Sequence, residues 1–512
     1  MLAIVKSLAL SGMEGHFIQV EVDVANGLPA FDIVGLPATT VREAKERVRT
    51  AVKNSGFDFP MKRITVNLAP ADLKKEGPGL DLPMAVGILV ATEQISIEKV
   101  TNCVFLGELS LDGTLRGIPG VLPMASAAVN LHSDLKLILP GDNAREAALV
   151  EELTVLGANT LKEVVDYFRG DVELVRTFSD KEFTPAASLG VDFQDIKGQA
   201  SVKRALEVAA AGNHNILLIG PPGTGKTMLA KALPGIMPDM TFSEAIEVTK
   251  VYSIAGLLPA NQPLVQDRPF RSPHHSTSSA GLAGGGRIPK PGEISLANHG
   301  VLFLDELPEF SRDVLEVLRQ PLEDRVITVS RAAATLTYPA RIMIASSMNP
   351  CHCGMATDNG GINCTCSPLQ IARYQARISG PLLDRMDIQI EVPRVSYEEL
   401  AGEGEGEGEV SIRIKSRVEK ARAIQRERLG QKNLANSEMN SRQVRLFCKL
   451  DAQGKELLHK AYKQLGLSAR AHDRILKVAR TIADLSGEKY ILTEHLAEAI
   501  QYRALDRGMS RV

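Results

Sequence analysis

Residues 215–229 read NILLIGPPGTGKTML, and the remainder of the 512-residue chain can be placed around them. Four consecutive apolar residues, 216–219, predict a buried parallel strand. They lead into GPPGTGKT at 220–227, which matches the pattern G-x-x-x-x-G-K-[ST], and residues 228–233 are expected to be helical. Strand, glycine-rich loop and helix in this order are the context of a phosphate-binding loop. The alternative is a chance glycine-rich turn.

The chemistry expected of this loop is the binding of ATP. Glycines let successive backbone N–H groups turn toward an anion, and the following helix adds its positive end. Lys226 is expected to reach the β- and γ-phosphates, and the Thr227 hydroxyl to ligate Mg²⁺. The predicted nucleotide contacts in this loop are Gly220, Pro221, Pro222, Gly223, Thr224, Gly225, Lys226, Thr227 and Met228.

A second part of the nucleotide site is predicted at GVLFLDELPE, residues 300–309. Residues 301–304 form another apolar run, which ends in two acids. An acid at the carboxyl end of a strand beside the phosphate loop can hold Mg²⁺, and its neighbour can polarise the attacking water. Asp305 is therefore assigned to the metal and Glu306 to the general base. The alternative is two solvated acids after a core strand.

Length and composition indicate a globular protein of several domains. The chain is too long for a single core, and it is 44% hydrophobic and 23% charged with a net charge of −2. The apolar run at the N-terminus is short, without the pattern of a signal peptide, and no window offers eighteen uninterrupted apolar residues. A cytoplasmic protein without membrane association is expected. The near-neutral charge neither indicates nor excludes a nucleic-acid partner.

The predicted fold class is α/β, in several parts. Residues 1–170 alternate strands and helices, and the polar segment 171–190 is interpreted as a linker. Residues 191–400 hold the nucleotide motifs in an α/β core. The acidic run AGEGEGEGE at 401–409 is predicted to be a flexible link, followed by a helical lid over residues 410–512.

One segment of the first domain is similar to a protease. ITVNLAPADLKKEGPGLDLPMAVGIL, residues 64–89, resembles the proteolytic domain of Lon-type proteases, which implies a ribosomal S5 domain 2-like fold. In that family the nucleophilic serine follows D-G-P. Here Gly79 follows E-G-P and has no hydroxyl, and the later GTLRGIPGVLPM segment offers no lysine as base. This domain is predicted to be proteolytically inactive.

Further positions match motifs of the AAA+ class of ATPases. Ile196 and Gly198 fall where those ATPases contact adenine. Asn349, after the predicted strand in ARIMIASSMNP, resembles sensor 1, and Arg385 in GPLLDRMD resembles the arginine finger that reaches a neighbouring subunit's ATP. Arg470 matches the second sensor arginine of the lid, with Arg474 as the fallback; solvated helix arginines are the alternative.

Two insertions resemble those of the AAA+ branch that holds MCM helicases and magnesium chelatase motor subunits. Residues 242–298 are rich in Gly, Pro and Ser and are expected to form a long mobile loop. Residues 326–339 alternate like two strands about a turn and predict a β-hairpin. Such loops line the ring's pore in that branch, although Arg331 can equally be an ordinary turn residue. The candidate DNA contacts are Arg271, His274, His275, Arg287, Lys290 and Arg331.

Paired C-x-C tripeptides occur within residues 350–367 and suggest a metal site. Two thiols from each tripeptide could close a tetrahedral Zn²⁺ site, with a structural role because four ligands leave no open position. His352 could replace one thiolate, and another thiophilic metal, reduced loop cysteines or a redox pair are alternatives. The proposed ligands are Cys351, Cys353, Cys364 and Cys366.

The order of all these parts closely resembles the YifB/ComM family of magnesium-chelatase-like AAA+ ATPases. The motifs that carry the resemblance include GPPGTGKT, FRSPHH, GEISLANHGVLFLDELPEF, MNPC and GPLLDRMD. The resemblance implies a hexameric, ATP-driven DNA helicase that promotes branch migration during natural transformation. Its implied partners are single-stranded and branched DNA, copies of itself and recombination proteins. A magnesium chelatase-type motor subunit and a protein-remodelling ATPase are the alternative functions.

Overall fold

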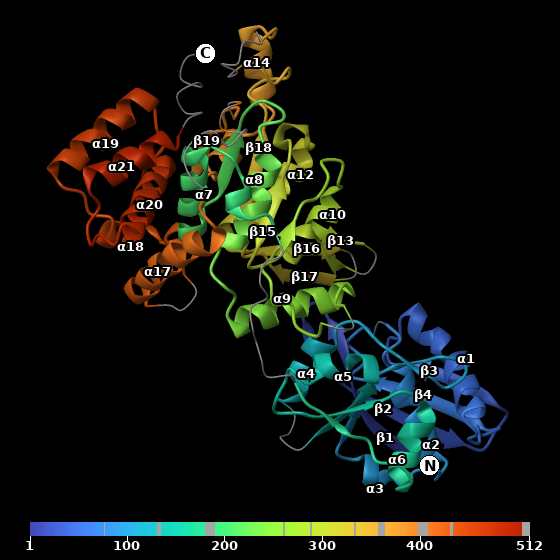
Figure 1. Ribbon diagram of the computed structural model, residues 1–512. Helices are drawn as coiled ribbons and strands as arrows, with labels where there is room; N and C mark the ends of the chain where they lie inside the picture. Colours follow the sequence, from blue (N-terminus) through green and yellow to red (C-terminus); the bar gives the residue numbers. More distant parts are fainter. Residues whose placement is uncertain are drawn as a thin grey trace.

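The computed structural model describes residues 1–75, 77–130, 135–179, 190–259, 262–286, 289–331, 334–356, 364–395, 397, 399, 408–430 and 434–503. Figure 1 shows three regions: an N-terminal α/β unit in blue, a central α/β unit in green and yellow, and C-terminal helices in red packed against the side of the central unit. The N-terminal unit lies beneath the central unit and contacts it through α9 (Phe242–Ala255).

The N-terminal unit is built on an eight-stranded mixed sheet of order β10-β9-β8-β5-β1-β2-β4-β3. Antiparallel pairs join β1 to β2, β2 to β4 and β9 to β10, and the other neighbours are parallel. The strands are β1 (Leu2–Ser11), β2 (Glu14–Ala25), β3 (Ala30–Val34), β4 (Arg63–Ala69), β5 (Cys103–Phe105), β8 (Lys136–Pro140), β9 (Thr154–Ala158) and β10 (Arg176–Thr177). Strand β10 falls within the segment expected to be a linker, so the sheet continues beyond residue 170.

Two apolar clusters sandwich this sheet, one on each face. Helices α1 (Thr39–Asn54), α2 (Asp81–Ala91) and α6 (Leu161–Arg169) contribute to one cluster. Helices α4 (Val121–Ala128) and α5 (Gly141–Ala147) contribute to the other. Every residue of α2 is buried, as its continuous apolar sequence predicts.

The central unit contains a five-stranded sheet of order β12-β15-β18-β11-β19, in which every pair is parallel. Its strands are β11 (Ile216–Ile219), β12 (Phe270–Arg271), β15 (Val301–Leu304), β18 (Met343–Met348) and β19 (Ile388–Glu391). Because parallel strands end at a common edge, this topology gathers the residues that follow β11, β15 and β18. The expected α/β class is confirmed.

The expectation of a long mobile loop at 242–298 is wrong for its first part. A capping box starts α9, with the Glu244 amide bonded to the Thr241 hydroxyl and the Thr241 amide bonded to the Glu244 carboxylate. Two short helices, α10 (Ser279–Ala283) and α11 (Glu293–Leu296), follow. The Gly, Pro and Ser content that suggested a loop is concentrated beyond this first helix.

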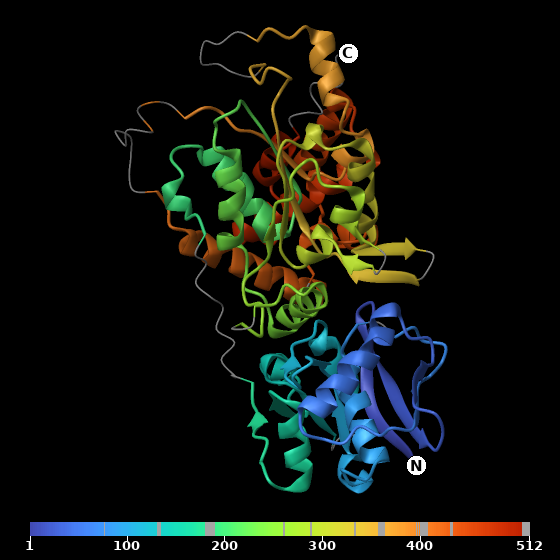
Figure 2. The same ribbon diagram turned by 90° about the vertical axis from the view of Figure 1, so that its right-hand side faces the viewer.

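The predicted hairpin is present. Strands β16 (Val326–Arg331) and β17 (Ala334–Pro339) pair antiparallel, and the hairpin lies just above the N-terminal unit in Figure 2. Leu336 belongs to the same apolar cluster as Met13, which lies in the turn between β1 and β2. A Cβ atom on Gly12 would lie only 3.0 Å from the Leu336 Cδ2 atom. This hairpin therefore packs against the N-terminal unit rather than extending freely.

A second contact between the two units is formed by α4 and α9. The Gly120 amide donates to the Ser253 carbonyl at 3.1 Å, and the Ser253 hydroxyl donates to Glu146 at 2.5 Å. Burial raises the pKa of Glu146. An apolar cluster surrounds these bonds; it consists of Leu122, Leu149, Met240, Ala245, Val248 and Leu264. Helix α4, which begins within the GTLRGIPGVLPM segment, is thus part of a domain contact.

The C-terminal helices are α17 (Ser411–Leu429), α18 (Ser441–Phe447), α19 (Ala452–Leu465), α20 (Ala469–Leu485) and α21 (Thr493–Gln501). Their apolar residues join one continuous cluster with α7 (Ala200–Gly212), β11 and β15. Residues 401–407 of the expected acidic link lie outside the described residues, while Glu409 pairs with Arg417 at 2.5 Å. None of the helices in the described ranges is both long enough and apolar enough to cross a membrane.

Candidate functional site

The phosphate loop surrounds the amino group of Lys226 with oxygen acceptors. Lys226 Nζ donates to the carbonyls of Gly220 and Pro221 at 2.7 Å each, and to Asn349 Oδ1 at 3.3 Å. Burial lowers the pKa of Lys226, while the charges of Asp305 and Glu306 oppose that shift. The lysine begins α8 (Lys226–Ala232), so the helix N-terminus and the ammonium group face the same space.

Glycines in this loop serve two different purposes. Gly223 and Gly225 have φ angles of 81° and 80°, a left-handed conformation that side chains rarely adopt. Gly220 instead allows close packing, because an added Cβ atom would lie 2.3 Å from the Val392 carbonyl oxygen. Glycines at these positions therefore allow the loop to turn its backbone amides toward a common point.

The two predicted acids occupy the end of the neighbouring strand β15. Thr227 Oγ1 donates to Asp305 Oδ2 at 2.9 Å, so the two expected Mg²⁺ ligands are in direct contact. The Ser347 hydroxyl donates to Asp305 Oδ1, and the Glu306 amide donates to Ser347 Oγ at 3.2 Å. Glu306 has a φ angle of 53° and an exposed side chain.

Ser347 is a site residue that the sequence interpretation missed. Its only sequence signal was its position near the end of β18, two residues before Asn349. The structure brings together the side chains of Lys226, Thr227, Asp305 and Asn349 through the hydrogen bonds described above. This arrangement is chemically suited to holding phosphate groups and a Mg²⁺ ion.

The predicted adenine contacts lie beside the same loop. Ile196 is buried, and Gly198 has a φ angle of 57°. Gln199 was not predicted as a site residue; its buried amide donates to the Thr224 carbonyl at 2.9 Å and the Pro393 carbonyl at 3.1 Å. It thereby connects the segment before α7 to the phosphate loop. Met228 lies on α8, with 38% of its surface exposed.

Arg385 lies at the opposite edge of the sheet from the phosphate loop. Arg385 precedes β19, which pairs parallel with β11 over four residues. The length of these paired strands, roughly 13 Å, therefore separates the amino edge, where Arg385 lies, from the carboxyl edge, where the phosphate loop begins. Arg385 donates to the Pro381 carbonyl at 2.6 Å and pairs with Glu323. Burial lowers its pKa, and the charges of Arg470 and Arg474 add to that shift.

The two candidates for the second sensor differ in their surroundings. Arg470 is exposed near the start of α20 and close enough to Arg385 to affect its pKa. Arg474 is mostly buried and contacts Asp387 at 3.5 Å. Both belong to the amino edge of the sheet, so the structure does not bring Arg470 to the phosphate loop of its own chain.

The four clustered cysteines come together beside the nucleotide site. Their Sγ atoms all lie within 4.8 Å of one another, and three of the separations are 3.3, 3.5 and 3.7 Å. Tetrahedral Zn²⁺ with bonds of about 2.3 Å requires sulfur separations of about 3.8 Å, so these residues fit that ion. Gly354 packs on Pro222 of the phosphate loop, since an added Cβ atom would lie 2.7 Å from the proline. His352 is not part of the cluster.

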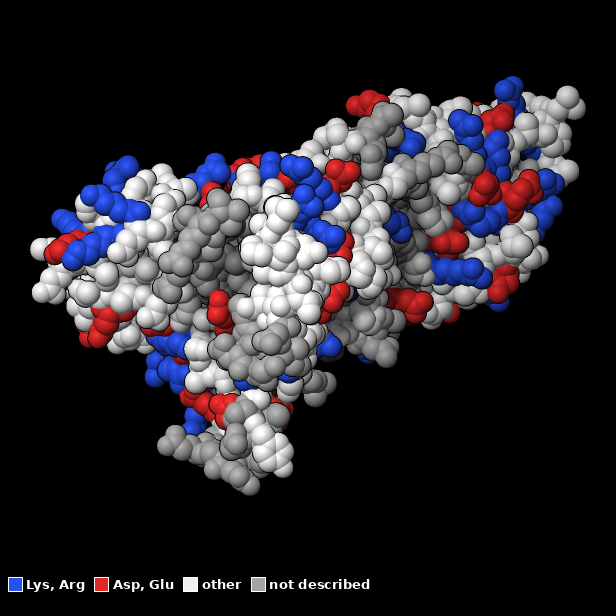
Figure 3. All heavy atoms as spheres, turned by 90° about the horizontal axis from the view of Figure 1, so that it is seen from above, with Lys and Arg blue, Asp and Glu red and all other residues white. Residues whose placement is uncertain are grey.

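The candidate DNA contacts have different environments. Arg271 makes a bidentate pair with Glu293 at 2.7 and 2.8 Å. The rings of His274 and His275 lie 4.0 Å apart, and His274 and Lys290 are exposed. Arg331 ends β16, and Arg287 lies outside the described residues. On the face seen in Figure 3, Lys and Arg are interspersed with Asp and Glu, without one extended basic surface.

Comparison with known proteins relates the whole chain to one family. The family described as magnesium chelatase, subunit ChlI, matches residues 192–400, with related ChlI families matching 20–143 and 408–503. Competence protein ComM of Haemophilus influenzae is 48% identical over 100% of this chain and 99% of its own length. The YifB protein of Escherichia coli is 45% identical over 99% of this chain and 98% of its own length. Lon protease 2 of Bacillus subtilis is 27% identical over 32% of each chain. The chain belongs to the magnesium-chelatase-like AAA+ ATPase family that includes ComM and YifB.

Proposed function

We propose that this protein is an ATP-driven hexameric DNA motor, a helicase or branch-migration translocase that acts in recombination during natural transformation. The observation that carries the proposal is the division of the ATPase machinery between the two sheet edges. Lys226 and Asp305 lie at one edge and Arg385 at the other, as a ring with shared ATP sites requires. Similarity to a competence protein over the full chain supports the cellular role.

ATP hydrolysis would use residues from two adjacent subunits. Lys226 and the loop amides bind the phosphates, while Thr227 and Asp305 would hold a Mg²⁺ ion, which would supply positive charge to the phosphate oxygens. Glu306 accepts a proton from the attacking water, and Asn349 orients that water. Arg385 and Arg470 enter from the adjacent chain and stabilise negative charge on the transferred phosphoryl group.

A structural zinc ion bound by the four cysteines would support this site. The cluster is close to the phosphate loop through the Gly354–Pro222 contact, and Asn349 is only two residues before the first cysteine. Backbone N–H groups of Met355 and Thr365 lower the pKa of Cys353, which favours the thiolate that a metal needs. The proposed role is to fix the loop that carries the sensor.

Contacts to DNA are proposed at the hairpin and at residues before and after α10. His274, Lys290 and Arg331 are the better candidates for phosphate contacts, because Arg271 is neutralised by Glu293. Such contacts are largely independent of sequence and weaken with salt. The N-terminal unit is proposed to be proteolytically inactive and to act as a docking or regulatory domain.

The test is the rate of ATP hydrolysis with and without single-stranded DNA, across a salt series, for wild type and Glu306→Gln. The motor proposal predicts stimulation by DNA that declines with salt and is abolished by the substitution. Strand displacement and branch migration would then be measured directly. A rate that DNA does not change at low salt would contradict the proposal.

A magnesium chelatase-type motor is the second candidate, because the matching families are described by that enzyme's subunit ChlI. A chelatase motor would hydrolyse ATP without a response to DNA and would support metal insertion only together with partner subunits. The same ATPase measurement therefore separates the two functions.

A further inference from the structure

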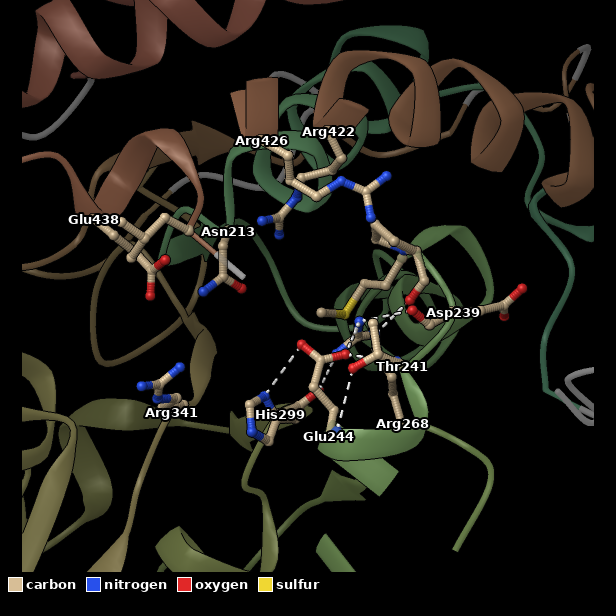
Figure 4. Close-up of a pocket in the computed structure, with 13 residues that line it drawn as sticks. Asn213, Asp239, Thr241, Glu244, Arg268, His299, Arg341, Arg422, Arg426 and Glu438 are labelled. Atoms are coloured by element: carbon tan, nitrogen blue, oxygen red, sulfur yellow. Dashed lines mark hydrogen bonds and ion pairs between the residues drawn. The ribbon is translucent and has the colours of Figure 1, made fainter. Parts of the chain in front are cut away.

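A cavity lined by arginines lies between the central unit and α17 (Figure 4). Asn213, His299 and Arg341 in its wall each precede a strand of the parallel sheet, so the cavity is at the amino edge. The phosphate loop follows the carboxyl end of β11 and is therefore a separate site. The volume of the cavity is about 70 Å³, enough for about two water molecules or one small tetrahedral anion.

The floor of the cavity is a closed network around Arg268. This arginine donates to the carbonyls of Pro238 at 2.5 Å and His299 at 2.6 Å, and contacts Glu244 at 3.4 Å. Glu244 also lies 3.5 Å from the His299 ring. Figure 4 shows these groups pointing toward one another below the hollow. The network accounts for the charge of Arg268, and its Glu244 carboxylate adds a longer-range attraction to Arg422.

The other two acids of the wall are paired as well. Asp239 contacts Lys415 at 2.5 Å, and Glu438 pairs with Arg325. Neither Lys415 nor Arg325 lines the cavity. The carboxylates of the wall are thus already engaged by other cations.

Helix α17 contributes two arginines, four residues apart and so on one face. Arg422 makes one long hydrogen bond, at 3.4 Å to the Ala210 carbonyl, and its Nε atom is buried with no partner within the described part of the chain. Arg426 is exposed and, like the exposed Arg341 across the cavity, makes no ion pair within the described ranges. Three guanidinium groups therefore surround the hollow without a close ion pair within the described ranges. Glu244 and Glu438 attract Arg422 from farther away, and Glu247 attracts Arg341 in the same way.

The electrostatic cost of this arrangement falls mainly on Arg422. Burial, and then the charge of Arg268, lowers its pKa to about 10. A buried cation without a close ion-pair partner is unfavourable. A multivalent oxyanion can accept several hydrogen bonds at once, and planar guanidinium groups match its oxygens in pairs.

We propose that this cavity binds a phosphate-class oxyanion through Arg422, Arg426 and Arg341. A bound anion would join α17 to the strand edge of the central unit, and so would tie the position of the C-terminal helices to anion binding. The phosphate group can come from free inorganic phosphate or from a nucleic-acid backbone. This site is separate from the phosphate loop, and the inference does not rest on the proposed motor function.

The test uses the full chain carrying Lys226→Ala, which removes the phosphate-loop lysine, and titrates it with inorganic phosphate in a calorimeter at low ionic strength. One phosphate should bind per chain. Adding Arg422→Gln or Arg426→Gln should weaken binding by about tenfold or more, as expected for loss of a charged hydrogen bond. Lys420→Gln removes the same charge from an exposed position of α17 outside the cavity, and should leave affinity within about twofold.

Because Arg426 is exposed, its substitution tests the site even if Arg422→Gln fails to fold. Absence of phosphate binding to the Lys226→Ala chain, or an affinity that neither arginine substitution changes, would overturn the proposal. A single-stranded oligonucleotide that competes with phosphate would identify a backbone phosphate as the ligand. Phosphate binding that the oligonucleotide does not affect would identify the free anion.

Discussion

The two edges of the central sheet carry complementary chemistry. At the carboxyl edge, Lys226 lies among backbone carbonyl oxygens and near the carboxylates of Asp305 and Glu306. These groups are suited to binding phosphate and a metal ion. At the amino edge, Arg385 lies near further arginines, and its pKa is lowered by burial and by their charges. In the proposed ring, the amino edge of one subunit supplies positive charge to the carboxyl edge of the next. In that proposal, neither edge alone is a complete catalytic site.

A comparison of one aspartate at each edge shows how position decides role. Asp305 contacts two hydroxyl groups, Thr227 and Ser347, in a partly exposed site that can accept a metal. Asp387 instead accepts a hydrogen bond from the Asn215 amide and lies 3.6 Å from the His214 ring, which is fully buried. The surroundings of the first suit metal binding, and those of the second suit a role in folding.

The largest effect is expected from Arg385→Ala. If the arginine acts in the neighbouring site, ATP turnover should fall by about 10³-fold or more with little change in ATP affinity. Chains carrying Arg385→Ala mixed with chains carrying Glu306→Gln should recover part of the turnover, since each supplies the group that the other lacks. Arg442→Ala, an exposed arginine on α18, is the control. Assembled mixtures without any recovery would contradict shared sites.

The next effect is on stability and distinguishes the two aspartates. Asp387→Asn leaves the mostly buried Arg474 without its carboxylate and should lower the free energy of unfolding by about 3–5 kcal/mol. Asp305→Asn should change it by about 1 kcal/mol or less while abolishing Mg²⁺-dependent turnover. Denaturant titrations and ATPase assays of both variants measure this. An equal loss of stability in Asp387→Asn and Asp305→Asn would contradict the assignment of a folding role to Asp387 alone.

The same pair predicts a pH dependence. Burial opposes the charge of Asp387, but the His214 hydrogen bond and the Arg474 charge outweigh it and lower the pKa to about 2. This lies below the value of about 3.9 for an unfolded aspartate. The stability that Asp387 contributes is therefore fully present above about pH 4 and is lost as pH falls from about 4 to about 2. Unfolding of Asp387→Asn should depend less on pH across this range.

A smaller effect separates the two sensor candidates. Arg470→Ala should reduce turnover by about tenfold to a hundredfold without loss of stability, because the side chain is exposed and is proposed to act in a neighbouring subunit's site. Arg474→Ala should instead destabilise the fold through its contact with Asp387. Thermal unfolding and turnover of the two variants, measured together, test this. A stable Arg474→Ala with the larger loss of turnover would reverse the assignment.

The smallest effect concerns the carboxyl edge and the cysteine cluster. Cys353→Ser should remove bound zinc and weaken ATP binding by about tenfold, because the cluster loop packs on Pro222. His352→Ala should retain zinc, since that ring is outside the cluster. Metal analysis and nucleotide titration provide the measurements. Zinc in Cys353→Ser at the wild-type level would exclude this four-sulfur site.

The sequence by itself determined the features that depend on adjacent residues. The strand at 216–219, the glycine loop after it, the strand at 301–304 and the hairpin at 326–339 all appear where local pattern predicts them. Backbone conformation and hydrophobic periodicity act over a few residues, so a short sequence suffices. The parallel sheet then placed Lys226 and Asp305 together, as their positions after strands imply.

Only the tertiary structure decided which distant residues share a site. Ser347, the docking of α9 against the N-terminal unit and the place of Arg470 beside Arg385 have no distinct local pattern. Arg422 meets the Ala210 carbonyl across 212 positions of sequence. The physical reason is that burial and charge pairing depend on the packing of complete units, and composition does not specify that packing.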